Sequence, residues 1–350
     1  MPEAKMDGCP LPTGRLTRRR LLRIVAAVAG LPPMIAAVRA SAPKPRLHSW
    51  NGDVLGALSE ITLWHPDAAF ARRTILRVRQ EIDRLEKIFS LYRPDSEVSR
   101  LNGAGRLTKP SPELRTLVEE SQRLGVLSGG ALDISVQPLW RLYEAHFWSR
   151  TEVQPDIAAR ARDVAQALVD FRRIDNGAKA IGFTRPGMAI TLNSIAQGYI
   201  TDVVADLLRN EGFESAVVNL GEYRTIGGHP DGRPWRIGIR DGRNAGSIDR
   251  VIDLENVALA VSGGYGTTFE ESGRYHHLFD PRTGASANTL IDVTVIGPRA
   301  TAADALATAI CVAGEPLAPA LLAAYPQTRA IVTRLDGTPV TFTSTGSTAT

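Results

Sequence analysis

Asp304 and Thr308 are the first pair of side chains whose types and spacing suit chemistry. They are four residues apart in a segment expected to turn helical from Thr301 onward, so carboxylate and hydroxyl would share one face, one turn apart. Hard oxygen donors of this kind suit Mg²⁺, which takes one or two protein carboxylates and completes its octahedron with water and phosphate oxygens. Thr301 and Asp304 also match the capping box, in which the acid only ties back to the start of a short helix. The spacing of Thr301 and Asp304, taken alone, favours a capping role for Asp304 over a metal-binding role.

Two adjacent histidines form a second candidate group. His276 and His277 lie in the segment GRYHHLFDPRTG, residues 273–284, where we expect a strand over 275–279. Neighbouring residues of a strand point to opposite faces, so only one imidazole can face a site. An imidazole that titrates near neutrality can accept the proton of an incoming hydroxyl or stabilise a leaving group. Adjacent histidines also occur without any function, so the pair alone does not show that one of them is catalytic.

A third segment, TLNSIAQGYITD at residues 191–202, passes from a strand-like run into a helix. The start of a helix offers unpaired N–H groups and the positive end of the helix dipole, which suit phosphate. Asn193, Ser194 and Gly198 would permit close approach of the backbone to a ligand. Turns of this kind are common, so the signal is weak by itself. The two common nucleotide fingerprints, GxGxxG and GxxxxGK[ST], are absent.

The elements that must position these groups follow one another irregularly. Apolar periodicity predicts helices at 67–92, at 111–129, after Pro155 and at 195–209. Strands are predicted at 215–220, 235–240, 257–261, 275–279 and 291–296, and a hairpin at 329–334 and 339–342. The lack of regular βαβ alternation favours an α+β fold over a doubly wound sheet. We expect a single domain over 41–350 that ends in a short disordered Ser/Thr/Gly-rich tail, 343–350.

The positive charge of the chain is concentrated in its first forty residues. Of 41 Lys and Arg and 37 Asp and Glu in 350 residues, seven cations and two acids lie in residues 1–40, which leaves 34 against 35. The rest of the chain is therefore close to neutral. Binding to a nucleic acid backbone depends on many Lys and Arg contacts, so we exclude a nucleic acid partner.

Residues 1–40 have the pattern of a twin-arginine signal peptide. Thr17-Arg18-Arg19-Arg20-Leu21-Leu22 precedes an apolar run over 24–38 and a small residue, Ala40, which predicts export and a periplasmic location. Gly30 and two prolines interrupt the run, which is shorter than the roughly 20 residues that a membrane span needs. We therefore expect no stable membrane insertion, with an uncleaved anchor as the alternative. Cleavage would leave Cys311 as the one cysteine, without an internal disulfide.

Taken together, these segments resemble the ApbE family, with similarity over about residues 55–345. FSLYRPDSEVSRLN at 89–102 is similar to the family's SLYRPDSELSRLN, and GALD at 130–133 resembles GAFD. Residues 191–202 resemble DLGGIAKGYAVD, and VNLG at 218–221 resembles VNLGG. YHHLFDPRTG at 275–284 is similar to YHHIIDPRTG, and DALATA at 304–309 matches the family's own motif. The order and spacing of the motifs make the resemblance specific.

The resemblance implies a T-fold-like α+β domain whose cleft holds FAD, with Mg²⁺ at the pyrophosphate. It also implies an FAD:protein FMN transferase, which attaches FMN to a threonine or serine of a partner protein and releases AMP. Carried over by position, the metal ligands are Asp304, Thr308 and the backbone carbonyl of Ser194. The residues implied to touch FAD are Tyr92, Ala131, Leu132, Asp133, Thr191, Gln197 and Leu278. His277 is the implied catalytic residue, either as base for the acceptor hydroxyl or as nucleophile in a transient phosphoramidate, and sequence leaves both open.

The chain departs from the family pattern at several positions. Gln197 stands where the family usually has Lys, Thr191 where it has an acid, and Glu222 in place of a second glycine. LNSIAQGYITD, LGEYR and SGGYGT together are similar to the NosX branch, whose members use the twin-arginine route and flavinylate the membrane protein NosR. NosR is thus a candidate acceptor flavoprotein.

Two other functions stay open, the first of which is favoured by the departures at Thr191 and Gln197. One is a periplasmic carrier that holds FAD without transferring it. The other is an FAD pyrophosphatase that releases FMN and AMP to water. An oxidoreductase is least favoured, because no second redox group or substrate motif is visible.

Overall fold

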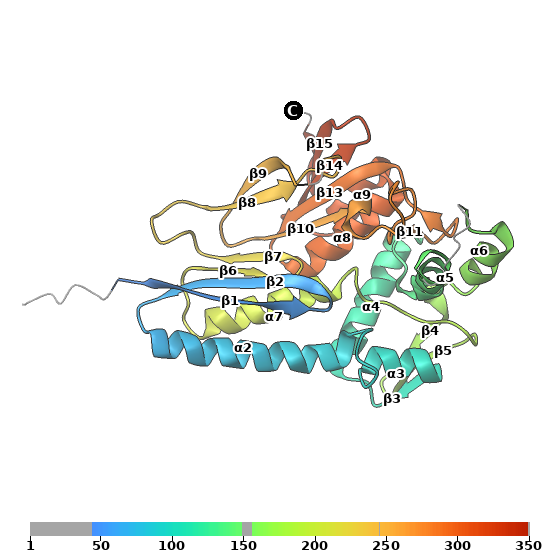
Figure 1. Ribbon diagram of the computed structural model, residues 1–350, viewed down its shortest axis with the longest axis horizontal. Coiled ribbons are helices and arrows are strands. Elements are labelled where there is room, and N and C mark those ends of the chain that lie inside the picture. Colours follow the sequence, from blue (N-terminus) through green and yellow to red (C-terminus); the bar gives the residue numbers. More distant parts are fainter. Residues whose placement is uncertain (1–43, 149–155, 245, 349–350) are drawn as a thin grey trace, which may run out of the picture. The chain divides into compact units, whose positions relative to one another are not determined.

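The computed structural model describes residues 44–148, 156–244 and 246–348, all within one compact unit, Lys44–Thr350 (Figure 1). The twin-arginine segment predicted at 1–40 lies outside these residues and stays a prediction. In the part of the chain that the structure describes, no helix has the length and apolar character needed to cross a membrane.

The centre of the unit is a nine-stranded sheet in which all neighbouring strands are antiparallel. Its order is β1-β2-β6-β7-β10-β13-β14-β15-β16. The strands are β1 (Arg46–Val54), β2 (Ala57–His65), β6 (Ala216–Asn219), β7 (Tyr223–Ile226), β10 (Ala258–Gly263), β13 (Leu290–Gly297), β14 (Arg329–Arg334), β15 (Pro339–Thr343) and β16 (Gly346–Thr348). The sheet thus places β7, β10 and β13 next to one another at its middle, and residues of β7 and β10 line the candidate site.

Three smaller sheets accompany the large one. They are β3 (Arg106–Thr108) with β5 (Ala180–Phe183) and β4 (Ile174–Asn176), β8 (Trp235–Arg240) with β9 (Ile248–Leu254), and β11 (Phe279–Asp280) with β12 (Ala285–Ser286). The mixture of antiparallel sheets and helices confirms the predicted α+β class.

The helices are α2 (Ala68–Phe89), α3 (Glu97–Ala104), α4 (Pro112–Leu127), α5 (Gln137–Phe147), α6 (Ala159–Gln166), α7 (Ala196–Asn210), α8 (Ala300–Ala313) and α9 (Ala318–Ala323). The four helices predicted from periodicity correspond to α2, α4, α6 and α7. The α2 helix begins at Asp67, whose carboxylate accepts hydrogen bonds from the N–H groups of Ala69 and Phe70. Sequence reasoning missed α3 and α5, and it also missed the β1–β2 hairpin.

Helix α8 is the element on which the site depends most. It packs against β10, β13 and α7. Ten of its fourteen residues are buried, so it is apolar on almost every side, as a helix inside a core must be. The sequence predicted a short helix here, but α8 extends to Ala313 because this apolar face continues. A carboxylate in such a helix, Asp304, is necessarily a buried carboxylate.

Two predicted segments are wrong. Residues 275–279 form no regular strand, since His276 makes only an isolated bridge to Thr268 and β11 begins at Phe279. The Ser286 hydroxyl replaces a strand partner: it accepts from the His276 N–H (2.9 Å) and donates to the His276 carbonyl (2.7 Å). The predicted disordered tail is also incorrect up to Thr348, because β16 pairs with β15 at the edge of the sheet. Thr348 at the end of β16 is consistent with this strand, since β-branched residues favour strands.

Candidate nucleotide and metal site

A cavity of about 420 Å³ lies where α7, α8, β10 and the β8–β9 hairpin meet. This volume is within the range of small-molecule sites, about 300–1,000 Å³. Ten of the eleven residues implied by the resemblance line it: Ala131, Leu132, Asp133, Thr191, Ser194, Gln197, His277, Leu278, Asp304 and Thr308. Segments far apart in sequence are therefore brought to one place.

Tyr92 is the implied residue that the structure does not bring to this cavity. It follows the end of α2, is 68% exposed, and its ring packs against the turn at Gly56, where an added Cβ would lie 3.0 Å from the ring. The direction of the chain after Ser90 turns Tyr92 toward the β1–β2 hairpin. Its predicted contact with FAD stays a prediction.

Asp304 is not the cap of its helix, which corrects the capping-box interpretation. The carboxylate of Asp202, on α7, caps α8 instead: it accepts from the N–H groups of Ala300 (3.0 Å) and Thr301 (2.9 Å) and from the Thr301 hydroxyl (2.7 Å). Asp304 Oδ2 accepts a hydrogen bond from the N–H of Gly198, 3.0 Å away. Asp304 is only 3% exposed, and its carboxylate does not cap the start of α8.

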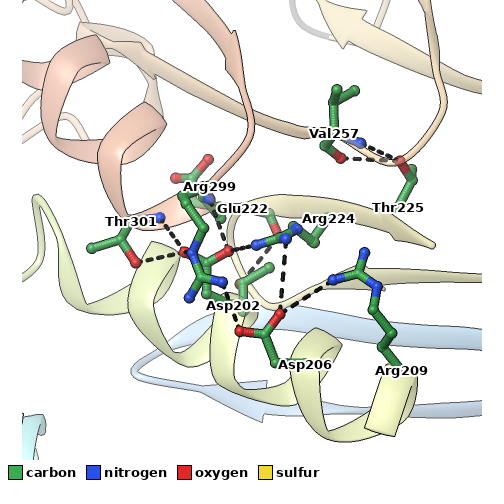
Figure 2. A network of polar contacts seen from close by, with 11 residues as sticks. Asp202, Asp206, Arg209, Glu222, Arg224, Thr225, Val257, Arg299 and Thr301 are labelled. Atoms are coloured by element: carbon green, nitrogen blue, oxygen red, sulfur yellow. Dashed lines mark hydrogen bonds and ion pairs between the residues drawn. The ribbon is translucent and has the colours of Figure 1, made fainter. Parts of the chain in front are cut away.

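The buried charge of Asp202 is balanced by two arginines (Figure 2). Arg224, on β7, donates to Asp202, and Arg299 lies 3.1 Å from it. Arg299 also contacts Asp206 at 2.6 Å. A buried carboxylate needs such partners because removing a charge from water is costly. The network joins α7 to β7 and to the start of α8, and so fixes the two helices that carry Gly198 and Asp304.

Gly198 allows α7 and α8 to touch backbone to backbone. A Cβ at this position would lie 2.4 Å from the Ala300 carbonyl oxygen and 2.9 Å from the Asp304 Cβ, distances that no real side chain tolerates. The absence of a side chain is what places the Gly198 N–H against the Asp304 carboxylate.

Thr308 faces the cavity one turn after Asp304, as the spacing predicts. Its hydroxyl hydrogen bonds with the hydroxyl of Ser262, on β10, at 3.0 Å. Ser194 lines the same cavity from the segment before α7. Carboxylate, hydroxyl and carbonyl oxygens are thus all available from the residues implied to hold Mg²⁺.

Glu222 adds a second buried carboxylate, whose position the sequence did not predict. It is 7% exposed, lines the cavity, and its Oε2 accepts from the Val261 N–H at 3.3 Å. Burial, followed by the nearby Asp304, raises the pKa of Glu222 well above its usual range. Burial likewise raises the pKa of Asp304. No cation among the described residues lowers either pKa, so two acids share one desolvated place.

This donor set fits Mg²⁺ on chemical grounds. The cation prefers oxygen ligands and few carboxylates, and a pair of buried carboxylates without a counter-charge is the environment that a divalent cation stabilises. Among the described residues, no group of three or more His, Cys, Asp and Glu could hold a metal ion, so hydroxyl and carbonyl oxygens must complete any such site.

The two histidines have different surroundings. His277 lines the cavity, and its Nδ1 hydrogen bonds with the Thr267 carbonyl at 3.1 Å; since a carbonyl only accepts, Nδ1 carries the proton and Nε2 is left as an acceptor. Burial lowers the pKa of His277 to about 4, which keeps the ring neutral at pH 7. His276 is 2% exposed and does not line the cavity. Its ring bonds to Asn288 and to the Leu278 N–H.

Asp133 serves the backbone rather than presenting a free charge to the cavity. Its Oδ1 accepts from the Ser135 N–H (2.8 Å) and hydroxyl (2.6 Å), and its Oδ2 accepts from the Phe171 N–H (2.9 Å). The predicted contact of the 131–133 segment with FAD would therefore involve backbone and apolar atoms more than this carboxylate.

Tyr265 and Arg240 are cavity residues that sequence reasoning missed. The Tyr265 ring occupies space left by two glycines, because a Cβ at Gly242 or Gly263 would lie 2.4 or 2.5 Å from it. The guanidinium of Arg240 lies 5.1 Å from the ring centre, a cation–π arrangement. Arg240 is the one Lys or Arg that lines the cavity in the described part of the chain. In the sequence, Gly242 and Gly263 were the signal that could have indicated a closely packed ring at Tyr265.

Comparison with known proteins matches residues 55–332 to the model of the ApbE family. The chain belongs to this family. It is 36% identical over 249 residues to an FAD:protein FMN transferase of Vibrio cholerae, covering 68% of this chain and 74% of that protein. It is 30% identical over 311 residues to one of Haemophilus influenzae, covering 85% and 88%.

The fold of this ApbE family member agrees with solved structures of relatives. The flavin transferase ApbE from Vibrio cholerae superposes with a TM-score of 0.72 at 29% identity, covering 86% of this chain and 98% of that one. The apo form of the Pseudomonas stutzeri flavinyl transferase ApbE gives 0.70 at 26% identity, covering 85% and 96%. The likeness extends over nearly the whole described unit.

Proposed function

We propose that this chain is an FAD:protein FMN transferase. It cleaves FAD at the pyrophosphate, joins the FMN phosphorus to a threonine or serine hydroxyl of a partner protein, and releases AMP. The observation that carries the proposal is one cavity in which neutral His277 lies with the Asp304 and Thr308 oxygens, in a chain whose relatives bear that name.

His277 accepts the proton of the acceptor hydroxyl in this proposal. Its Nδ1 bond to Thr267 fixes the ring and leaves Nε2 toward the reaction. The acceptor oxygen forms a bond to the FMN phosphorus as the bond from that phosphorus to the bridging oxygen breaks. The bridging oxygen leaves with AMP, and the proton held at Nε2 can pass to the leaving phosphate.

Asp304, Thr308 and the carbonyl of Ser194 would hold Mg²⁺. When bound, this cation neutralises charge on the pyrophosphate of FAD. The residues Ala131, Leu132, Thr191, Gln197 and Leu278 form the walls that enclose FAD. Arg240 supplies a positive charge in the cavity of a chain that has Gln197 where the family usually has lysine.

We further propose that the protein works in the periplasm and serves an acceptor like NosR. The twin-arginine pattern of residues 17–22 supports the location, and the segments LGEYR and SGGYGT support the NosX-like branch. Proteomics of the periplasmic and membrane fractions of the native cell, before and after deletion of this protein, tests both. Loss of one flavinylated membrane protein is expected, and unchanged flavinylation would contradict the assignment.

An assay with FAD, Mg²⁺ and a peptide that contains a Ser/Thr-Gly-Ala-Thr site tests the reaction type. Transferase activity adds the mass of FMN to the peptide. AMP without modified peptide would indicate a pyrophosphatase, and binding of FAD without either product would indicate a carrier. Asp304→Asn is expected to remove the transfer.

A further inference from the structure

Glu222 is a buried acid that the proposed reaction has not yet used. It occupies the turn between β6 and β7, where the N–H of Leu220 donates to its carbonyl at 3.1 Å. The Thr201 hydroxyl of α7 donates to the same carbonyl at 3.3 Å. The backbone of Glu222 is thus tied to α7, one turn beyond the Gly198 N–H that binds Asp304.

The side chain of Glu222 is directed to the same place as Asp304 and Thr308. Strand β10 joins them: its Val261 N–H donates to Glu222 Oε2 at 3.3 Å, and the next residue, Ser262, bonds to Thr308 at 3.0 Å. Gly221, just before Glu222, makes room for the side chain of Gln197, since a Cβ there would lie 2.7 Å from Gln197 Cδ. Glu222, Thr308 and Asp304 all line the cavity.

An ionised carboxylate without a counter-charge would weaken the binding of the substrate. FAD brings a negatively charged pyrophosphate. A second buried negative charge beside Asp304 would repel this pyrophosphate, and the two carboxylates would repel each other. One long hydrogen bond from a backbone N–H does little to offset the loss of water. No arginine, lysine or histidine among the described residues forms a salt bridge with Glu222 or Asp304. A divalent cation held by both acids would remove the conflict.

We infer that Glu222 is a carboxylate ligand of the divalent cation that Asp304 and Thr308 hold, so that the protein binds this cation before FAD arrives. The inference rests on the proposed function, because it adds a ligand to the metal site of the same cavity. A second carboxylate raises the affinity for a hard cation through charge. The cation then converts an anionic cavity into one that accepts a pyrophosphate.

Binding of Mn²⁺ without FAD tests this directly. The free Mn²⁺ is measured by electron paramagnetic resonance during titration of the purified chain and of three variants at neutral pH. Glu222→Gln keeps the shape of the side chain and is expected to weaken binding by at least about 10-fold. Asp304→Asn is expected to weaken it as well. Asp292→Asn is the matched control, because Asp292 is equally buried, accepts from Thr333, and lies outside the cavity.

Thermal unfolding separates a ligand from a merely structural residue. If Glu222 is a ligand, Glu222→Gln leaves the Tm of the metal-free protein at or above that of the parent, because glutamine keeps the shape of the side chain without its charge, and reduces the rise in Tm that Mn²⁺ produces. A structural role would lower the Tm with and without Mn²⁺. Glu222→Gly, which matches the glycine of the family motif, should behave like Glu222→Gln in the titration.

The results distinguish the inference from the proposed function. Parent-like Mn²⁺ affinity in both Glu222 variants, with loss in Asp304→Asn, overturns the role of Glu222 and leaves the proposed metal site standing. Parent-like affinity in Asp304→Asn overturns both. Weakened binding in the Glu222 and Asp304 variants but not in Asp292→Asn supports the inference.

Discussion

At the scale of single residues, environment separates side chains that the sequence presents as equals. His276 and His277 are neighbours of the same type, but one ring is enclosed by hydrogen bonds to Asn288 and Leu278 while the other faces the cavity. Asp304 and Asp202 differ in the same way: Asp202 is paired with arginines and caps a helix, whereas Asp304 has the Gly198 N–H as its hydrogen-bond donor and no arginine among the described residues beside it.

The two histidines are expected to respond differently to alanine. His277→Ala should lower kcat for FMN transfer by about 10²–10⁴-fold, the usual contribution of a general base, with little change in Tm. His276→Ala should lower the free energy of unfolding by about 1–3 kcal/mol, because it leaves the buried Leu278 N–H unpaired, and keep most of the activity of the folded protein. Peptide mass spectrometry and thermal melts measure both. Equal loss of kcat in two well-folded variants would refute the assignment.

The pKa of His277 should reveal that its ring is shielded from water. Its pKa of about 4 lies below the ordinary 6.5, so the neutral ring contributes stability that is complete above pH 6.5 and is lost as pH falls through 4. In the metal-free, FAD-free protein, nuclear magnetic resonance of ring-labelled histidine should show His277 still neutral at pH 6, with His277→Ala to identify the signal. Titration of that signal near 6.5 would contradict the burial.

The residue scale also shows what sequence could predict about the site. The resemblance to the ApbE family implied ten residues that the structure brings to one cavity, whereas spacing alone placed only Asp304 and Thr308 on one face of a helix. The cap of α8 could not be predicted in that way, since Asp202 is 98 residues from Ala300 and a local capping box competed for the same pattern. Glu222 was visible only as a departure from glycine, and its meaning depends on the burial that tertiary packing produces.

At the scale of elements, the site depends on the contact between α7 and α8. Sequence periodicity predicted α7 well, and it predicted that α8 begins near Thr301. It missed β1 and β2, whose hairpin turn at Leu55 and Gly56 needs positive φ at both residues and offers only one glycine as a signal. The strand expected at 275–279 failed because side-chain hydrogen bonds from Ser286 hold that segment instead.

Gly198→Ala tests the contact between the two helices. The added methyl would meet the Ala300 carbonyl, so we expect α7 and α8 to separate, with a loss of about 1–3 kcal/mol in the free energy of unfolding and a fall in Mn²⁺ affinity. Gly103→Ala is the control, because Gly103 lies in α3 with no atom within 4 Å of an added Cβ. It should be neutral or stabilising by up to about 1 kcal/mol. Similar effects in both variants would show that the helix contact is not decisive.

At the scale of the whole molecule, the Ser/Thr-rich C-terminal segment up to Thr348 belongs to the large sheet and not to the lining of the cavity. The C-terminal residues 343–350, TSTGSTAT, superficially resemble the Ser/Thr-Gly-Ala-Thr site that the family modifies. Thr343 ends β15, and Gly346–Thr348 form the edge strand β16, which pairs with β15. The backbone of this strand cannot reach a cavity between α7, α8 and β10 without breaking that pairing.

We therefore expect no self-flavinylation of the tail. Intact-mass spectrometry of the protein after incubation with FAD and Mg²⁺ should give the unmodified mass, and the denatured protein should be colourless. Truncation after Thr343 serves as a control and should leave transfer to the peptide unchanged. An FMN adduct on the tail peptide would show that the chain is one of its own acceptors.

The ratio of AMP released to peptide flavinylated tests the central claim most directly. Both products are quantified from one reaction with FAD, Mg²⁺ and the acceptor peptide, by chromatography for AMP and mass spectrometry for the peptide. The proposed transfer requires one AMP for each FMN attached, and at least about 10²-fold less of both products with His277→Ala or Asp304→Asn. AMP formed in excess with the peptide unmodified would mean that water is the acceptor, and the account of this protein as a transferase would be wrong.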